Sequence, residues 1–347
     1  MKACVIEKPM KYSIQDISTP EIKDDEVLLR ITVAGICTND IRDYKGSNYT
    51  YPRVGGHEYA GVIEKMGKDV DTNLFHVGQK ATNYIIENCG CCYECKHHAE
   101  NLCGAAANGP TFYKKDGTSG YFGFAQYKAV KASHLNVFPD DADARVIAFT
   151  EPLSCVINSI NKTNIQLGDT VVVIGGGVMG LMHVMCAVKQ GANVIVSETQ
   201  EARRQLALEL GAKAVIDPMH EDPVEKVKEL TKGQMAQVVF NTTAIAAVAD
   251  QAIQMTGKRG TVVMFSSIHP NTPVPVDLGR VHSNEIRIQG SVSTTATSFA
   301  QAVDCLTNGI IDITPLMDKM FEYTDITEAM EYACRPDTYK VLIHFSD

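Results

Sequence analysis

From residue 168 onward, short apolar runs alternate with longer amphipathic segments. The stretch GDTVVVIGGGVMGLMHVMCAVKQGANVIVSE contains an apolar run, a glycine-rich turn, a helix-length apolar segment and a second run. Helices are then predicted at 201–210, 222–231 and 244–256, and strands at KAVID, AQVVFNTT, GTVVMFSS and EIRIQGS. Strands that alternate with helices in this way predict a doubly wound, parallel sheet.

One uncharged run, Val171 to Val188, reaches the length of a membrane span. Three consecutive glycines at 175–177 and the imidazole of His183 interrupt it. The run is therefore interpreted as a strand, a tight turn and a buried helix, and no membrane association is expected.

Length and charge narrow the class of protein. A chain of 347 residues is too long for one ordinary core, so about two domains are expected. The net charge of −9 argues against a nucleic-acid surface, which needs clustered Lys and Arg. The start MKACVIEKPMKY has no apolar signal region. Eleven cysteines without an export signal indicate a reducing, cytoplasmic compartment, where close cysteines more often bind metal than form disulfides.

Five cysteines cluster in the stretch ENCGCCYECKHHAENLC. Cys89, Cys92, Cys95 and Cys103 are spaced as four thiolates on a tight loop, with Cys91 as an extra thiol. Four thiolates at about 2.3 Å complete tetrahedral zinc and leave no open position, so a structural site is expected. Iron–sulfur ligation is the main alternative, and Cys91 in place of Cys92 is another.

A second set of candidate ligands is dispersed along the chain. AGICTNDIR contains Cys37, VGGHEYAG contains His57 and Glu58, and FTEPLSC contains Glu151. Thiolate, imidazole and carboxylate ligands with a water molecule form the open, catalytic type of zinc site. Taken singly, Cys37 could be a buried thiol, His57 a turn residue and Glu151 a helix N-terminal charge. Their occurrence beside a nucleotide-binding pattern favours a catalytic metal.

The glycine-rich turn has the G-x-G-x-x-G spacing. Gly175, Gly177 and Gly180, with Val178 and Met179 between them, join a predicted strand to a predicted helix. The glycines allow a tight turn and close approach of a pyrophosphate, and the helix N-terminus supplies N–H groups to it. The pattern therefore predicts dinucleotide binding.

A carboxylate follows at the end of the next strand. Glu198 lies 18 residues after Gly180, where it would accept hydrogen bonds from a ribose diol and repel a 2′-phosphate. NAD is therefore expected in preference to NADP. Arg203 is a candidate cofactor contact, although a solvated helix face is the simpler explanation for both Arg203 and Arg204.

With these motifs, the chain resembles the zinc-dependent medium-chain dehydrogenase/reductase superfamily, the alcohol dehydrogenases, over essentially all of its length. The resemblance rests on GHE at 56–58, the four-cysteine lobe, EP at 151–152 and the glycine loop. It is greatest to the polyol (sorbitol-like) and threonine dehydrogenase branches, because Glu151 replaces the second cysteine of the Cys₂His zinc site.

The resemblance implies an α/β chain with two domains. A GroES-like, β-rich catalytic domain at 1–151 would include the zinc lobe at 89–103, a Rossmann NAD-binding domain would span 152–293, and residues 294–347 would return to the catalytic domain. Relatives pair through edge strands of the nucleotide domain, so the segment IRIQGSVS implies a homodimer or homotetramer.

The resemblance also implies two zinc ions per chain, one structural and one catalytic. Cys37 and His57 would hold the catalytic ion, and either Glu58 or Glu151 would be the direct third ligand. Relatives usually place Ser or Thr two residues after the zinc cysteine as a proton relay, and often His three residues further on.

This chain departs from that relay, because it has Asn39 and Arg42 at the two positions. An amide is a poor proton carrier, so Glu58 or Glu151 acting with water is the alternative base. The guanidinium of Arg42 could hold an anionic substrate group, although an exposed helix arginine is the simpler explanation.

The sequence thus predicts an NAD-dependent zinc dehydrogenase that oxidises a secondary alcohol in a small polar compound, a polyol or sugar derivative. The alternatives are a threonine-type or an acidic or phosphorylated alcohol substrate, and a protein that binds NAD and zinc without turnover. The complete ligand set argues against that last class and against a zinc-free quinone reductase.

Overall fold

The computed structural model describes residues 1–47, 51–104, 118–268 and 271–346, and they form two compact units. The first unit comprises residues 1–154 and 295–347, and the second comprises residues 155–294. Helix α5 (Thr150–Asn161) contains the point at which the chain leaves the first unit.

The second unit is built on one six-stranded sheet. Its strands are β10 (Thr170–Ile174), β11 (Asn193–Ser197), β12 (Ala214–Ile216), β13 (Ala236–Asn241), β14 (Thr256–Met264) and β15 (Arg287–Gly290). Their order is β12-β11-β10-β13-β14-β15 and every pairing is parallel. This is the doubly wound Rossmann order, with its reversal point beside β10, and it confirms the predicted fold class.

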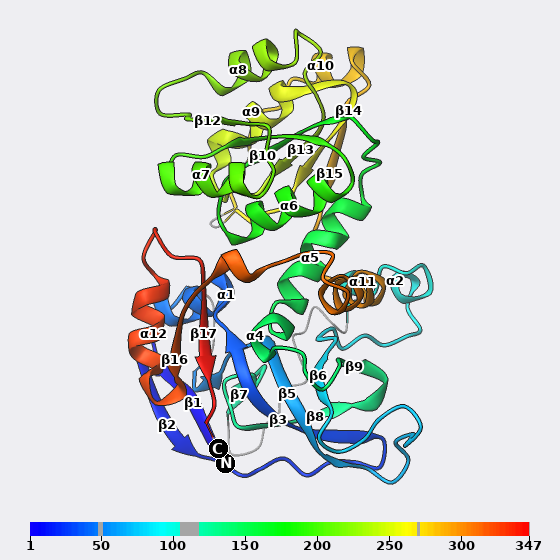
Figure 1. Cartoon of the computed structure of the whole chain (residues 1–347), viewed down its shortest axis with the longest axis vertical. Helices are drawn as coiled ribbons and strands as arrows, with labels where there is room; N and C mark the ends of the chain where they lie inside the picture. Colours follow the sequence, from blue (N-terminus) through cyan, green and yellow to red (C-terminus); the bar gives the residue numbers. More distant parts are fainter. Residues whose placement is uncertain (48–50, 105–117, 269–270, 347) are drawn as a thin grey trace. The chain divides into compact units, whose positions relative to one another are not determined.

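Helices cover both faces of this sheet (Figure 1). They are α6 (Val178–Lys189), α7 (Glu201–Glu209), α8 (Pro223–Leu230), α9 (Ala246–Met255) and α10 (Leu278–Ser283). Helices were predicted from the sequence at 201–210, 222–231 and 244–256. Both ends of each lie within two residues of the ends of α7, α8 and α9.

The strands of the second unit are apolar because the sheet is buried on both faces. Val172, Val239 and Val262 are fully buried in its core, with Ile174 and Ile195 almost so. A strand covered on both sides has no solvated face and therefore shows a continuous apolar run instead of alternation.

The first unit is rich in strands. They are β1 (Lys2–Lys8), β2 (Lys11–Asp16), β3 (Glu26–Gly35), β4 (Arg53–Val54), β5 (Glu58–Met66), β6 (Lys80–Asn83), β7 (Ser119–Gly120), β8 (Tyr127–Lys131), β9 (Leu135–Val137), β16 (Met317–Glu322) and β17 (Lys340–His344). One sheet has the order β2-β1-β4-β7, and the other has the order β16-β17-β3-β5-β6-β9, with β8 paired to β3.

Short helices connect these strands. They are α1 (Thr38–Lys45), α2 (Tyr93–Lys96), α4 (Ala144–Ile147), α11 (Ala296–Thr307) and α12 (Ile326–Ala333), with 3₁₀ turns at Glu100–Leu102, Ala132–His134, Thr314–Leu316 and Tyr323–Asp325. Between the strands lies a core that includes Val5, Leu29, Ile63, Phe124 and Ile343.

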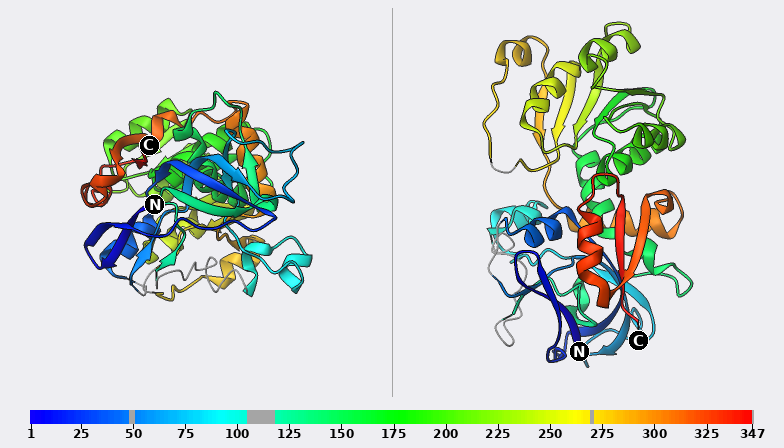
Figure 2. Two further views of the ribbon diagram at one scale, coloured as in Figure 1. Left: turned by 90° about the horizontal axis from the view of Figure 1, so that it is seen from below. Right: turned by 90° about the vertical axis from the view of Figure 1, so that its left-hand side faces the viewer.

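The C-terminal segment belongs structurally to the first unit. Strand β17 pairs antiparallel with β3 and parallel with β16, and α12 packs beside it, as Figure 2 shows for the red end of the chain. The last fifty residues therefore complete a sheet that begins near residue 26.

Within the described ranges, no helix has both the length and the apolar character needed to cross a membrane. The run from Val171 to Val188 is instead divided between β10, the glycine turn and α6.

His183 is a fully buried imidazole on α6. Its Nδ1 lies 2.7 Å from the carbonyl oxygen of Met179 and its Nε2 lies 3.0 Å from Oγ of Ser159. The rings of Phe240 and Phe265 lie 4.6 and 4.7 Å from it, centroid to centroid. Burial disfavours the imidazolium and lowers the pKa of His183 to about 4, against the opposing bond to Met179.

Because His183 is buried as the neutral imidazole, we expect the protein to lose stability as the pH falls. Because the pKa of His183 is about 4 in the folded state and about 6.5 in the unfolded chain, the unfolded state binds more protons between these values. The free energy of unfolding should fall by roughly 2 kcal/mol between about pH 7 and about pH 5 from this group alone. Urea unfolding followed by circular dichroism measures it. In the variant His183→Gln the free energy of unfolding should lack this part of its pH dependence. If it fell with pH as steeply in the variant as in the unsubstituted protein, His183 would not be the group responsible.

Candidate active site and metal centres

Two strands bring three potential metal ligands together in the first unit. The ligand atoms of Cys37, His57 and Glu58 all lie within 4.8 Å of one another. Cys37 caps helix α1 directly after β3, and Glu58 begins β5. Because β3 and β5 are antiparallel and Gly35 pairs with Glu58, the end of one strand meets the start of the other. Residues twenty positions apart in the sequence therefore converge.

Asp40 fixes the two ligand-bearing loops to each other. One carboxylate oxygen accepts a hydrogen bond from the N–H of Cys37 and the other from the N–H of Gly56, both at 3.0 Å. Asp40 is 1% exposed, and a Cβ atom on Gly55 would lie 2.8 Å from its Oδ1. Gly56 has a φ of +80°, which favours glycine. Sequence analysis did not identify Asp40, although its position three residues after Cys37 is typical of a capping-box acid.

The imidazole of His57 is suited to a metal. It is 8% exposed, and its Nδ1 has no hydrogen-bond partner among the described residues. Burial opposes the protonated imidazole, but the neighbouring Cys37 thiolate raises the pKa of His57 well above its ordinary value. Burial also raises the pKa of Cys37. A metal ion must therefore displace protons to bind, as it does at thiolate and imidazole sites generally.

Glu58 is held by a lysine from the other end of the chain. Nζ of Lys340 lies 2.5 Å from Oε2 of Glu58 and 3.3 Å from the carbonyl oxygen of Ile36. The side chain of Lys340 is 7% exposed and that of Glu58 is 2% exposed. Burial works against the ammonium, yet the charge of Glu58 raises the pKa of Lys340 above its ordinary value. Lys340 was not among the residues predicted from the sequence. The one feature that could have indicated it is its charge inside the otherwise apolar run YKVLIHF.

The remaining predicted site residues lie on neighbouring helices. Glu151 is in the first turn of α5 and is 8% exposed. It is not one of the three ligands that lie together, Cys37, His57 and Glu58. Its charge nevertheless contributes to raising the pKa of His57. Asn39 and Arg42 are half-buried on α1. The ring of Tyr121 packs against His57, with 5.0 Å between ring centroids, and no sequence motif indicated it.

The four-cysteine lobe forms the second possible metal site. The Sγ atoms of Cys89, Cys92, Cys95 and Cys103 all lie within 4.8 Å of one another, with separations of 4.0 Å for 89–95, 3.4 Å for 92–95 and 3.6 Å for 89–103. Four sulfur atoms at about 2.3 Å from a tetrahedral zinc ion are about 3.8 Å apart. The set therefore fits zinc, and Cys91 is exposed and outside it.

Backbone N–H groups in this lobe point at sulfur atoms and so favour the thiolate form. The N–H of Cys92 points at Sγ of Cys89 (3.4 Å) and the N–H of Cys89 points at Sγ of Cys103 (3.5 Å). Hydrogen bonds from the backbone of Cys91 and Cys92 lower the pKa of Cys89 to about 6. The buried carboxylate of Glu100 accepts the N–H of Ala296 at 2.6 Å and so ties the lobe to the first residue of α11.

The glycine loop of the second unit leaves its backbone open at one position. Gly175 has a φ of +98°, and a Cβ atom on Gly180 would lie 1.9 Å from the carbonyl oxygen of Gly175. Gly177 is the N-cap of α6. A Cβ atom added to Gly177 would have open space around it, since the nearest atom would be Nη1 of Arg203 at 3.8 Å. Val178 and Met179 begin the helix itself. This arrangement admits a pyrophosphate at the helix N-terminus.

Glu198 lies against this loop. Its Oε2 accepts the N–H of Gly176 at 2.6 Å, and its Oε1 accepts the N–H of Gln200 at 2.8 Å. The expectation of a solvated helix face is wrong for Arg204, whereas Arg203 is half-buried. Arg204 is 9% exposed, because its guanidinium binds the carbonyl oxygens of Glu198 and Thr199 and the carboxylate of Asp217.

Comparison with known proteins places this geometry in a family. Residues 23–140 match the alcohol dehydrogenase GroES-like domain and residues 178–308 match the zinc-binding dehydrogenase domain. The chain is 30% identical over 337 residues to D-arabitol-phosphate dehydrogenase of Enterococcus avium, covering 94% of this chain and 92% of the relative. It is 28% identical over 355 residues to sorbitol dehydrogenase of Bacillus subtilis, covering 99% and 97%.

A solved zinc-binding dehydrogenase of Sinorhizobium meliloti, bound to NADP, superposes with a TM-score of 0.90 at 28% identity, covering 99% of this chain and 98% of the neighbour. The chain belongs to the zinc-type medium-chain alcohol dehydrogenases, which confirms the resemblance drawn from its motifs. Zinc and a nicotinamide dinucleotide are accordingly its cofactors.

Asp40 provides a test of the first metal site. Asp40→Asn keeps the size of the side chain but replaces one acceptor oxygen by a donor amide, which faces a backbone N–H. We expect the affinity for zinc at the Cys37 group to fall by about 10- to 100-fold, as for other residues that orient metal ligands. Competition with a chelator measures it, and zinc in the four-cysteine lobe is the internal control. Equal retention of both ions in the variant would contradict the role given to Asp40.

Proposed function

We propose that this chain is an NAD-dependent zinc dehydrogenase that oxidises a secondary alcohol of a small polar compound, a polyol or sugar derivative. The observation that carries the proposal is the convergence of Cys37, His57 and Glu58 in a chain that also has an open glycine loop. The relatives named for D-arabitol phosphate and sorbitol support a polyol-like substrate.

Cys37, His57 and Glu58 would hold the catalytic zinc. Zinc in such a site, when bound, supplies a Lewis acid for the alcohol oxygen, and NAD supplies the hydride acceptor. Asp40 fixes the backbone of Cys37 and Gly56, so the ligand geometry is set before a substrate arrives. Lys340 balances the charge of Glu58 through an ion pair with Oε2, and Oε1 would be left for the metal.

The proton of the alcohol needs an acceptor other than Asn39, whose amide carries protons poorly. Of the buried carboxylates near His57, Glu58 is engaged by Lys340, Asp40 by two backbone N–H groups and Asp43 by Arg53, which leaves Glu151. We assign to Glu151, acting through water, the role of proton acceptor. Val178, Met179 and Arg203 would contact the dinucleotide at the glycine loop.

His57→Ala tests the proposal. Loss of a metal Lewis acid worth several kcal/mol should lower the rate of NADH formation by at least roughly a thousandfold on any alcohol of a polyol panel. Zinc analysis should show that the four-cysteine lobe keeps its ion. Undiminished oxidation in the variant would refute a catalytic metal here. If the zinc-loaded, unsubstituted protein oxidised no panel member, a non-catalytic role would be favoured.

Glu198 should set the preference for NAD. In Glu198→Ala the repulsion of a 2′-phosphate and the acceptor for the ribose diol are both lost. We expect the ratio of kcat/KM for NAD to that for NADP to fall by at least about tenfold, since a hydrogen bond to a charged group is worth about 1.5–3 kcal/mol. Arg203→Ala is the matched comparison and should weaken both cofactors together. An unchanged ratio in Glu198→Ala would rule out this role.

An anionic alcohol is the second candidate substrate. The relative named for a phosphorylated polyol favours it, and half-buried Arg42 on α1 is the residue to hold the anion. Arg42→Ala should lower kcat/KM for a phosphorylated polyol by about 10- to 100-fold and leave a neutral polyol nearly unchanged. Arg42→Lys should retain part of the difference. Equal losses for both substrates would exclude the anion contact.

We also propose that the chain assembles as a homodimer or homotetramer. Strand β15 is one of the two edge strands of the six-stranded sheet, the other being β12, and Ile288 on β15 and Val292 just after it are 44% and 56% exposed. An exposed apolar edge strand favours pairing with a second copy. Light scattering at the mass of a single 37.8 kDa chain would contradict this.

A cytoplasmic location fits the state of the cysteines. All eleven are unpaired, as expected in a reducing compartment. Isolation of the native protein with disulfides among them would count against this location.

A further inference from the structure

The second unit has a hollow of about 360 Å³ at the amino ends of its strands. It is lined by Gln237, Val238, Lys258, Arg259, Thr261 and Arg287, together with Asn164 and Asp169. These are the ends opposite to those that lead into the glycine loop, since β10 runs from Thr170 to Gly175. Its volume lies within the range of small-molecule sites.

Three strands form the floor of this hollow in register. Val238 on β13 pairs with Thr261 on β14, and Thr261 pairs with Arg287 on β15. Neighbours in a parallel register point to the same face, so the three side chains lie in one row. Thr261 is 6% exposed, and its hydroxyl makes no hydrogen bond within the part of the chain that the structure describes. The hydroxyl is not one of the fully buried polar atoms that lack a partner, so it opens to the hollow and is available to a ligand.

A second neutral donor, the amide of Gln237, also lines the hollow. Oε1 of Gln237 accepts the N–H of Thr170 at 2.8 Å, which fixes the amide. The NH₂ group of Gln237 is therefore its remaining donor at the hollow. The hollow thus offers the hydroxyl of Thr261 and the amide NH₂ of Gln237.

The rim carries cations on an irregular turn. Between Ala236 and Val238 the partner strand β14 has extra residues, so Gly257 to Gly260 bulge outward and carry Lys258 and Arg259. A Cβ atom on Gly257 would lie 2.6 Å from the carbonyl oxygen of Gln234, which requires glycine there. Arg259 has a φ of +59° and its N–H donates to Asn284 at 2.7 Å. The turn is held against the sheet.

Two of the three cations that line the hollow have no counter-ion within the described part of the chain. Among the described residues, Lys258 and Arg287 form no ion pair, and Arg259 has only an exposed contact of 3.6 Å to Glu285. The one acid that lines the hollow, Asp169, accepts the N–H of Gln166 at 2.8 Å. The unit as a whole has 12 Lys and Arg and 12 Asp and Glu, so the positive excess here is local.

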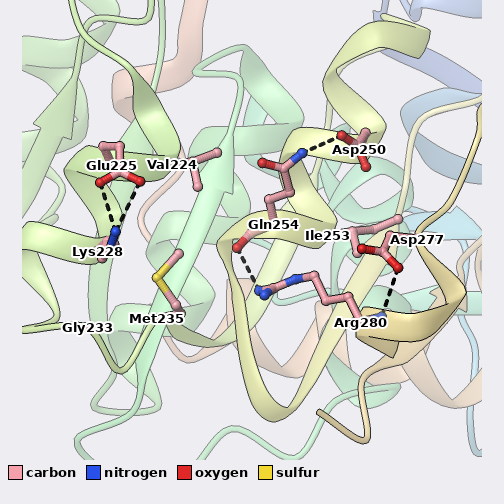
Figure 3. A pocket seen from close by; sticks show the side chains of 10 residues that line it. All are labelled: Val224, Glu225, Lys228, Gly233, Met235, Asp250, Ile253, Gln254, Asp277 and Arg280. Carbon is pink, nitrogen blue, oxygen red and sulfur yellow. Dashed lines mark hydrogen bonds and ion pairs between the residues drawn. The ribbon is translucent and has the colours of Figure 1, made fainter. Parts of the chain in front are cut away.

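A larger hollow in the same unit, of about 510 Å³, has a different character (Figure 3). There Lys228 pairs with Glu225, Arg280 donates to the carbonyl oxygen of Gln254, and Asp277 caps the backbone of α10. Its lining has three acids, Glu225, Asp250 and Asp277, against two cations, Lys228 and Arg280, so it has no positive excess to offer an anion.

We propose that the hollow at the amino ends of β13, β14 and β15 binds a small oxyanion with a phosphate group. Lys258 and Arg287 would compensate the charge, and Thr261 and Gln237 would donate to the oxygens. The ligand is a free phosphate or a phosphate ester of a metabolite. This site is independent of the dehydrogenase chemistry proposed for the first unit.

Calorimetric titration of the zinc-loaded protein, saturated with NADH so that the glycine loop is filled, tests the proposal. The probes are inorganic phosphate and glycerol phosphate, with chloride at matched ionic strength as the blank. We expect one site per chain for the oxyanion. The double variant Lys258→Gln/Arg287→Gln should weaken it by more than about tenfold, since each charge-assisted hydrogen bond is worth about 1.5–3 kcal/mol.

Further variants separate a built site from general surface charge. Thr261→Val should weaken phosphate binding about threefold or more, because a neutral hydrogen bond contributes about 0.5–1.5 kcal/mol. Lys213→Gln removes an exposed cation of the same unit outside the hollow and should have no effect. Tighter binding of glycerol phosphate than of free phosphate would identify an ester as the ligand, and the reverse order would identify the free ion. Absence of binding, or equal affinity in the double variant, would overturn the proposal.

Discussion

The antiparallel pairing of β3 with β5 is the interaction on which the candidate active site depends. It places Cys37, just past the end of one strand, beside His57 and Glu58 at the start of the other. Strand pairing alone leaves the two loops free to separate, and the buried carboxylate of Asp40 bonds both of them. Because a buried carboxylate is costly unless it is fully hydrogen-bonded, Asp40 has a single favourable arrangement, and that arrangement fixes the ligands.

A second constraint comes from charge. Glu58 and Lys340 are buried together, and their burial is tolerable only as a pair. Lys340 lies on β17, so the site is complete only when the C-terminal segment has joined β3. This explains why a segment that follows the whole second unit in sequence belongs to the sheet of the first. The folding of the catalytic group therefore depends on a contact between residues 58 and 340.

How far the sequence predicts these features depends on how local they are. The four-cysteine lobe and the glycine loop are contained in short stretches, and their spacing alone predicts a four-thiolate metal site and a dinucleotide-binding turn. The sulfur separations of 3.4–4.0 Å fit the predicted tetrahedral site. By contrast, the choice between Glu58 and Glu151 depends on strand register, and the partner of Glu58 depends on a pairing across 282 residues. Arg204 was misjudged because its burial is set by Asp217 and two carbonyl oxygens on other segments.

The most direct measurement is anomalous diffraction at the zinc edge from crystals of the protein prepared without chelators. We expect one peak among Cys89, Cys92, Cys95 and Cys103, and a second bounded by Cys37, His57 and Glu58, with Lys340 still beside Glu58. A peak in the cysteine lobe alone, or a second ion bound by Glu151 with Glu58 turned away, would contradict the arrangement on which the proposed dehydrogenase rests.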